Sequence, residues 1–117
     1  MTKPLSIDEY DLVSFFEMEP TPLDPDIPWV YNDSAYEAGD ARCHVSFAIT
    51  PFVKDVRVVM KLDSVPVYEL NAMGVEDVRC HNDKGRESLE IIISSRDSIW
   101  LRVKPTISIS HHCTNQP

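Results

Sequence analysis

Residues 87–103 read ESLEIIISSRDSIWLRV and carry the most regular pattern in the chain, two apolar runs separated by the polar turn 95–97. Opposed residues of an antiparallel pair point to the same face, and a slip of one residue would exchange the two faces. Pairing Ile92 with Trp100 gathers only apolar side chains on one face: Leu89, Ile91, Ile93, Ile99, Leu101 and Val103. The segment therefore predicts a β-hairpin that contributes one face to the core.

A third strand, residues 75–81, precedes this hairpin. The intervening turn 82–86 has good hairpin chemistry, because Gly85 can take a left-handed conformation. Keeping Val78 and Cys80 on the core face requires Val78 opposite Ile91 and Cys80 opposite Leu89. We therefore predict a three-strand meander over residues 75–103 at the centre of the fold.

Alternating apolar residues mark further strands before the meander. Residues 42–50 and 54–62 pair with Ile49 opposite Val56, and residues 66–71 return with Tyr68 opposite Met60. Pro66 indicates a sheet edge, and residues 106–110 form a last strand. About eight short strands at intervals near ten residues predict an all-β, single-domain antiparallel β-sandwich over residues 1–117, with a small β-barrel as the alternative.

The N-terminal third is less regular. The alternation of Leu12, Phe16 and Met18 favours a strand over residues 10–19, and a helix over residues 7–16 is the competing interpretation. We expect at most one short helix. Residues 20–28 hold four prolines and predict a stiff connection that crosses between sheets or covers a sheet edge. Residues 29–32 read as a short strand, and we expect residues 1–9 and 111–117 to be loosely ordered ends.

The net charge of −8 is concentrated in the first third of the chain. Residues 1–40 hold ten acidic side chains against one lysine, whereas residues 41–117 hold ten basic and nine acidic side chains. Such a surface disfavours nucleic acids and anionic membranes and favours a basic protein partner or a divalent cation. The candidate binding residues in this acidic patch are Glu17, Glu19, Asp24, Asp26 and Asp33.

Catalytic and metal-binding motifs do not emerge from the sequence. The sequence lacks the regular ligand spacings of zinc sites. Neighbouring residues such as Cys43 and His44 also face opposite sides of a strand, so they cannot bind the same metal ion. Gly-x-Ser-x-Gly and phosphate-binding glycine loops are also missing. We therefore predict no enzyme, no cofactor and no metal site. Three cysteines, the lack of a signal-peptide core and the lack of a long apolar run indicate a cytoplasmic protein.

The outer face of the meander is a second candidate binding surface. The predicted register places Glu90 between Arg79 and Arg102, beside Ile92 and Trp100. Such residues form either ordinary cross-strand pairs or a binding hot spot. Trp100 could equally be covered by the Pro-rich segment.

These observations predict a small acidic protein that works by binding another protein. One concrete form is a bacterial immunity protein that blocks a basic toxin through charge complementarity. A first alternative is a module that binds carbohydrate through Trp29, Tyr31 and Tyr36, or calcium through Asp24, Asp26, Asp33 and Asp40 gathered at one end. A second alternative is a homodimer that buries the Trp100 face.

Overall fold

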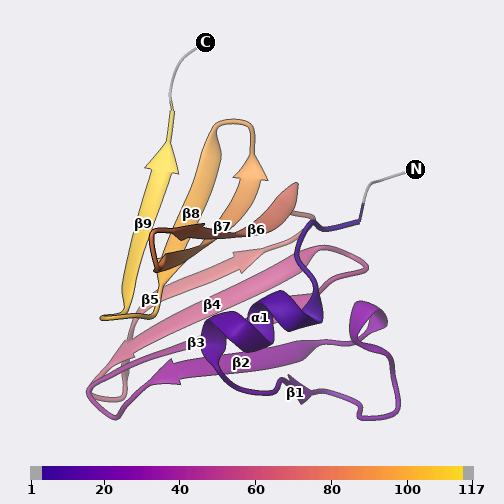
Figure 1. Cartoon of the computed structure of the whole chain (residues 1–117), viewed down its shortest axis with the longest axis horizontal. Coiled ribbons are helices and arrows are strands. Elements are labelled where there is room, and N and C mark those ends of the chain that lie inside the picture. Colours follow the sequence, from indigo (N-terminus) through magenta and orange to yellow (C-terminus); the bar gives the residue numbers. More distant parts are fainter. Residues whose placement is uncertain (1–3, 115–117) are drawn as a thin grey trace.

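A computed structural model describes residues 4–114, which form two antiparallel sheets and one α-helix. The five-stranded sheet has the order β1 (Thr21–Pro22), β2 (Ser34–Gly39), β3 (Cys43–Thr50), β4 (Asp55–Leu62) and β5 (Val65–Ala72). The four-stranded sheet has the order β6 (Asp77–Asp83), β7 (Arg86–Ser94), β8 (Asp97–Arg102) and β9 (Ser108–Cys113). Figure 1 shows the strands of the second sheet running across those of the first. The predicted all-β sandwich is confirmed.

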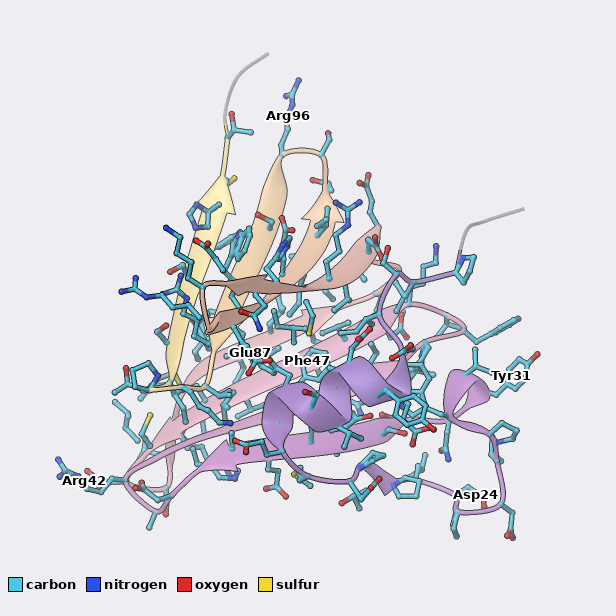
Figure 2. All side chains as sticks on the ribbon, viewed as in Figure 1. Asp24, Tyr31, Arg42, Phe47, Glu87 and Arg96 are labelled. Carbon is cyan, nitrogen blue, oxygen red and sulfur yellow. The ribbon has the colours of Figure 1, made fainter. Side chains whose placement is uncertain are left out.

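The core lies between the two sheets and is built from their alternating inward rows. The fully buried residues of β3 and β4 are Val45, Phe47, Ile49, Val56 and Val58, and those of the other sheet are Val78, Leu89, Ile91, Ile99 and Leu101. Phe47 lies near the middle of the molecule in Figure 2. The predicted pairs Ile49–Val56 and Tyr68–Met60 are confirmed, and β5 is a sheet edge as Pro66 indicated.

The meander is confirmed with one change of register. Val78 pairs with Ile91 and Cys80 with Leu89, as predicted, but Cys80 is exposed and the expectation that it lies in the core is wrong. In the second hairpin, however, Trp100 pairs with Glu90 and not with Ile92. The turn closes tightly between Ser94 and Asp97, and a bulge between Ile92 and Ser94 displaces the partner strand. The displacement is two residues, so the predicted core face is preserved.

The strand predicted for residues 10–19 is wrong, because helix α1 spans Glu9–Phe16. Asp8 caps it: the Asp8 carboxylate accepts from the Asp11 backbone N–H, and the Asp11 carboxylate accepts from the Asp8 backbone N–H. Leu12, Phe15 and Phe16, spaced three and four residues apart, turn one face of α1 into the core. There Phe16 stacks on Tyr36 and Phe47, at ring distances of 5.4 and 5.6 Å.

The expected loose ends are more ordered than predicted. Ile7 is buried, and the Ser6 hydroxyl and backbone N–H both donate to the Asp77 carboxylate. At the other end, residues 111–113 belong to β9, whose backbone pairs with β8. Residues 1–3 and 115–117 of the expected ends lie outside the described residues.

The segment after the helix also differs from its prediction in part. Residues 29–32 contain the 3-10 helix Trp29–Tyr31 and not a strand. The Pro-rich segment does cover a sheet edge, because its two-residue strand β1 pairs with Ser34 and Ala35 of β2. It therefore lies on the five-stranded sheet, whereas Trp100 belongs to the other sheet.

Candidate partner-binding surfaces

The acidic patch lies mostly along the path from the end of α1 to the start of β2. Glu17, Glu19, Asp24 and Asp26 are exposed, and Asp33 is half-buried. Glu17 ends α1 in a left-handed conformation and forms an ion pair with Lys104, so its charge is partly compensated. We regard Glu19, Asp24 and Asp26 as the part of the patch whose charge is most available to a partner.

One buried amide organises the loop that carries Asp24 and Asp26. The Asn32 side chain is 4% exposed and donates from Nδ2 to the backbone carbonyls of Asp24, at 2.6 Å, and Ile27, at 3.0 Å. Its Oδ1 accepts from the backbone N–H groups of Asp24, at 3.3 Å, and Asp33, at 2.9 Å. Asn32 therefore replaces the regular backbone pairing that a proline-rich loop cannot make.

The other two loop aspartates, Asp33 and Asp40, have different partners. Nη2 of Arg57 donates to both carboxylate oxygens of Asp33, at 2.8 and 2.6 Å. Asp40 follows the far end of β2, where its carboxylate accepts from the backbone N–H groups of Arg42 and Cys43. Figure 2 places Asp24 and Arg42 at opposite ends of the molecule. The expectation that four aspartates gather at one end is therefore wrong for Asp40.

Trp29 separates two grooves at the same end of the sandwich. One groove, of about 240 Å³, contains Glu9, Glu19 and prolines of the Pro-rich segment. The other, of about 200 Å³, is mainly apolar. Trp29 lines both, and its Nε1 donates to the Tyr36 hydroxyl at 3.0 Å. Burial raises the pKa of Tyr36 to about 12, although the hydrogen bond from Trp29 acts in the opposite direction. Tyr36 is fully buried, so it cannot stack on a sugar as the carbohydrate alternative requires.

The outer face of the four-stranded sheet does not form the predicted arginine–glutamate–arginine row. Arg79 is opposite Glu90 as predicted, but its guanidinium contacts Asp77 at 3.0 Å. Arg102 is exposed and pairs through the backbone with Ser108 of β9. Glu90 instead contacts Nε2 of His81 at 2.8 Å. For Arg102 the two-residue shift in register is the reason, because it places Trp100 and not Arg102 opposite Glu90.

Trp100 lies between two histidine rings on this face. His81 stacks on it at a ring distance of 4.8 Å, and His112 approaches at 6.4 Å with its ring nearly perpendicular. Trp100 is only half-buried, and the Pro-rich segment is paired elsewhere. This face thus presents a compact row of rings and a carboxylate, made by Glu90, His81, Trp100 and His112.

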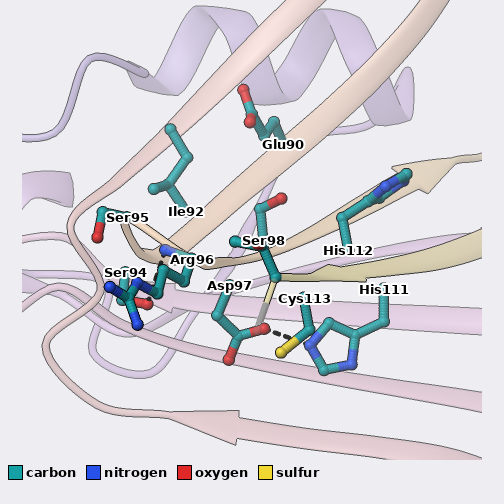
Figure 3. Close-up of a pocket in the computed structure, with 11 residues that line it drawn as sticks. Glu90, Ile92, Ser94, Ser95, Arg96, Asp97, Ser98, His111, His112 and Cys113 are labelled. Carbon is teal, nitrogen blue, oxygen red and sulfur yellow. Dashed lines mark hydrogen bonds and ion pairs between the residues drawn. The ribbon is translucent and has the colours of Figure 1, made fainter. Parts of the chain in front are cut away.

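An open pocket of about 550 Å³ lies at the β7–β8 turn, next to β9. The Asp97 carboxylate and the His111 ring are joined by a hydrogen bond at its side, as Figure 3 shows. Over residues 4–114, no group of three or more His, Cys, Asp or Glu side chains is placed to hold a metal ion.

Two features of the acidic end were missed by sequence reasoning. The sequence gives only a weak indication that Asn32 holds the loop together, because asparagine is a common turn residue and its presence after a proline-rich loop is not unusual. The exposed aromatic pair Tyr31 and Phe52 comes from distant segments, so only the fold brings the two rings together.

Within residues 4–114, helix α1 and the 3-10 turn are both too short to cross a membrane.

Comparison with known proteins gives a structural likeness. No protein-family model and no curated protein matches this sequence. A chain in a solved structure described as "Contact-dependent growth inhibition toxin - immunity protein complex from Klebsiella pneumoniae 342" superposes with a TM-score of 0.80. The match covers 97% of this chain and 100% of that chain, at 22% sequence identity. At this identity the likeness establishes the fold, which the two chains share over nearly their whole length.

Proposed function

We propose that this chain is an immunity protein, a non-catalytic inhibitor that binds a toxin in the cytoplasm and neutralises it. The observation that carries the proposal is the structural likeness over 97% of the chain to a component of a toxin–immunity complex. The distribution of charge favours the inhibitor over the toxin of such a pair. Residues 4–41 contain no lysine or arginine and hold all ten of the acidic side chains of the first third.

The charge also supports a basic partner. A toxin that acts on nucleic acid needs a cationic surface to bind phosphates. An inhibitor with carboxylates on one end is complementary to that surface, and complementary charge mainly accelerates association. Glu19, Asp24 and Asp26 are the exposed carboxylates that we assign to this role.

The proposal predicts that the toxin is encoded beside this gene, and the protein product of the neighbouring gene is therefore the test partner. Co-expression of the wild-type chain should restore growth of cells that produce the toxin, and the purified proteins should form a stable complex. A toxin that remains fully active with an excess of the folded chain would refute the proposal.

Charge variants then test the acidic patch. In Glu19→Lys/Asp26→Lys we expect association with the toxin to slow about tenfold at low salt, with a weaker dependence on ionic strength. The matched control is Glu69→Lys/Asp83→Lys, which makes the same change of charge at exposed positions on β5 and at the end of β6. Equal association rates for both variants would exclude a specific role for the acidic patch.

A further inference from the structure

Two exposed aromatic rings meet beside the acidic loop. Tyr31, in the 3-10 helix, is 59% exposed, and Phe52, in the β3–β4 turn, is 66% exposed. Their ring centroids are 5.2 Å apart. Val30 and Val53, next to them in the sequence, are 40% and 51% exposed. Scattered single apolar residues are normal on a surface, whereas two exposed rings in contact are a candidate contact site.

The pair is held in place by the backbone. The N–H of Phe52 donates to the carbonyl of Val30 at 2.9 Å, which joins the two segments directly. The N–H of Tyr31 donates to the carbonyl of Pro28 at 3.0 Å, and the next residue is the buried Asn32 that fixes the acidic loop. A surface that is ordered before binding loses less conformational entropy on association.

An apolar groove of about 200 Å³ adjoins Phe52, one of the two rings. Its walls are formed by Leu5, Ile7, Trp29, Val30, Pro51 and Phe52. The hydrogen bond from the Trp29 indole N–H to the Tyr36 hydroxyl opposes rotation of the indole ring into this groove, so the groove stays open. The end of the sandwich therefore offers a protruding ring pair next to a recess that could receive one side chain of a partner.

Charge identifies the kind of partner. Figure 2 shows Tyr31 and Asp24 at the same end of the molecule. Arg57 is engaged by Asp33, and Lys54 is the charged side chain among the residues that line the apolar groove. Asp24 and Asp26 are exposed on the loop that Asn32 holds against the 3-10 helix. An apolar centre with an acidic rim is complementary to a protein surface that presents an apolar side chain among lysines or arginines.

We propose that Tyr31 and Phe52 are the apolar anchor by which this chain binds its toxin, with the groove beside Trp29 receiving an apolar side chain of that basic partner. This inference rests on the proposed function and adds the location and the chemistry of the contact. Aromatic residues in the centre of an interface carry a large share of the binding free energy, while charged residues at the rim mainly set the association rate.

The test measures how tightly the toxin that the wild-type chain neutralises binds to the variant Tyr31→Ala/Phe52→Ala. We expect the affinity to fall at least about 30-fold, mainly through faster dissociation. The matched control is Val65→Ala/Val67→Ala, which shortens two apolar side chains of similar exposure, 59% and 52%, on the edge strand β5. We expect the control to bind within about threefold of the wild type.

Each outcome decides between the two proposals. If the wild-type chain binds and neutralises the toxin but the aromatic variant binds as tightly as the control, the anchor is refuted and the immunity function stands. If the wild-type chain neither binds nor protects, the proposed function fails and the anchor fails with it. Hydrogen exchange of the wild-type complex needs no variant: residues 28–33 and 51–54 should gain protection, and unchanged exchange there would also refute the anchor.

Discussion

Asn32→Ala should destabilise the protein more than a substitution at any exposed position of the loop that Asn32 supports. The reason is that the buried Asn32 side chain makes four hydrogen bonds to the backbone. Two strong bonds from Nδ2 each contribute about 1 kcal/mol net, and the two bonds to Oδ1 together contribute about as much as one of them. Water can reach part of the exposed loop and replace some of this loss. We therefore expect the free energy of unfolding to fall by about 2 to 3 kcal/mol.

For a chain of this length, 1 kcal/mol corresponds to about 4 °C in the melting temperature, so the midpoint should fall by about 8 to 12 °C. Urea unfolding followed by circular dichroism measures the change. The matched control is Asn71→Ala at an exposed position of β5, which should stay within about 0.5 kcal/mol of the wild type. A loss below about 0.5 kcal/mol in Asn32→Ala would refute the role of the amide.

Amide hydrogen exchange separates the local effect from the global one. Loss of the Asn32 side chain frees the N–H groups of Asp24 and Asp33, which donate to Oδ1. Both amides should exchange faster in Asn32→Ala, beyond the change expected from global stability. Unchanged relative protection at these two sites would show that the amide does not hold the loop.

Two further predictions concern the scaffold. Phe16→Ala should lower the free energy of unfolding in urea by about 3 to 4 kcal/mol, because the ring is buried against Tyr36 and Phe47. The control Tyr10→Ala, on the exposed side of α1, should lower it by less than about 0.5 kcal/mol. Similar losses in the two variants would contradict the placement of α1. Burial alone would raise the pKa of Asp77, but hydrogen bonds, chiefly from the hydroxyl and backbone N–H of Ser6, outweigh it and hold that pKa below its usual value. The lowered pKa stabilises the fold above the unfolded-state value of about 3.9, and this contribution is lost as the pH falls through the folded-state value. Asp77→Asn should therefore be less stable than the wild type at pH 7 by about 1 kcal/mol, and the difference should shrink below about pH 4; a difference independent of pH would refute this assignment.

The alternation of apolar residues was enough to predict the faces of the strands. Ile49, Val56, Val78 and Ile91 are buried as their patterns required, since a slip of one residue would place polar side chains in each inner row. The register beyond Ile92 could not be obtained this way. A shift of two residues leaves both faces unchanged, so the hydrophobic pattern is blind to the bulge that produces it.

Helix α1 was predictable in principle. Asp8 and Asp11 form the capping pair, and the apolar spacing of Leu12, Phe15 and Phe16 fits a helical face. The competing alternation of Leu12, Phe16 and Met18 is equally visible over so short a run, and tertiary packing decides between them.

The partner-binding surfaces were harder to predict. Charge alone marks the acidic patch, whereas Tyr31 and Phe52 are separated by two strands in the sequence.

Because of the Asn32 amide, the residues that stabilise the fold and the loop residues that can contact a partner are different ones. The amide supports the loop from inside, so the exposed positions 23–27 contribute little to the packing between the sheets. Substitutions at those positions can therefore change the charge and shape presented to a partner while the melting temperature stays nearly constant. A protein built in this way can acquire a new binding specificity through a few loop residues, without first compensating for damage to its core.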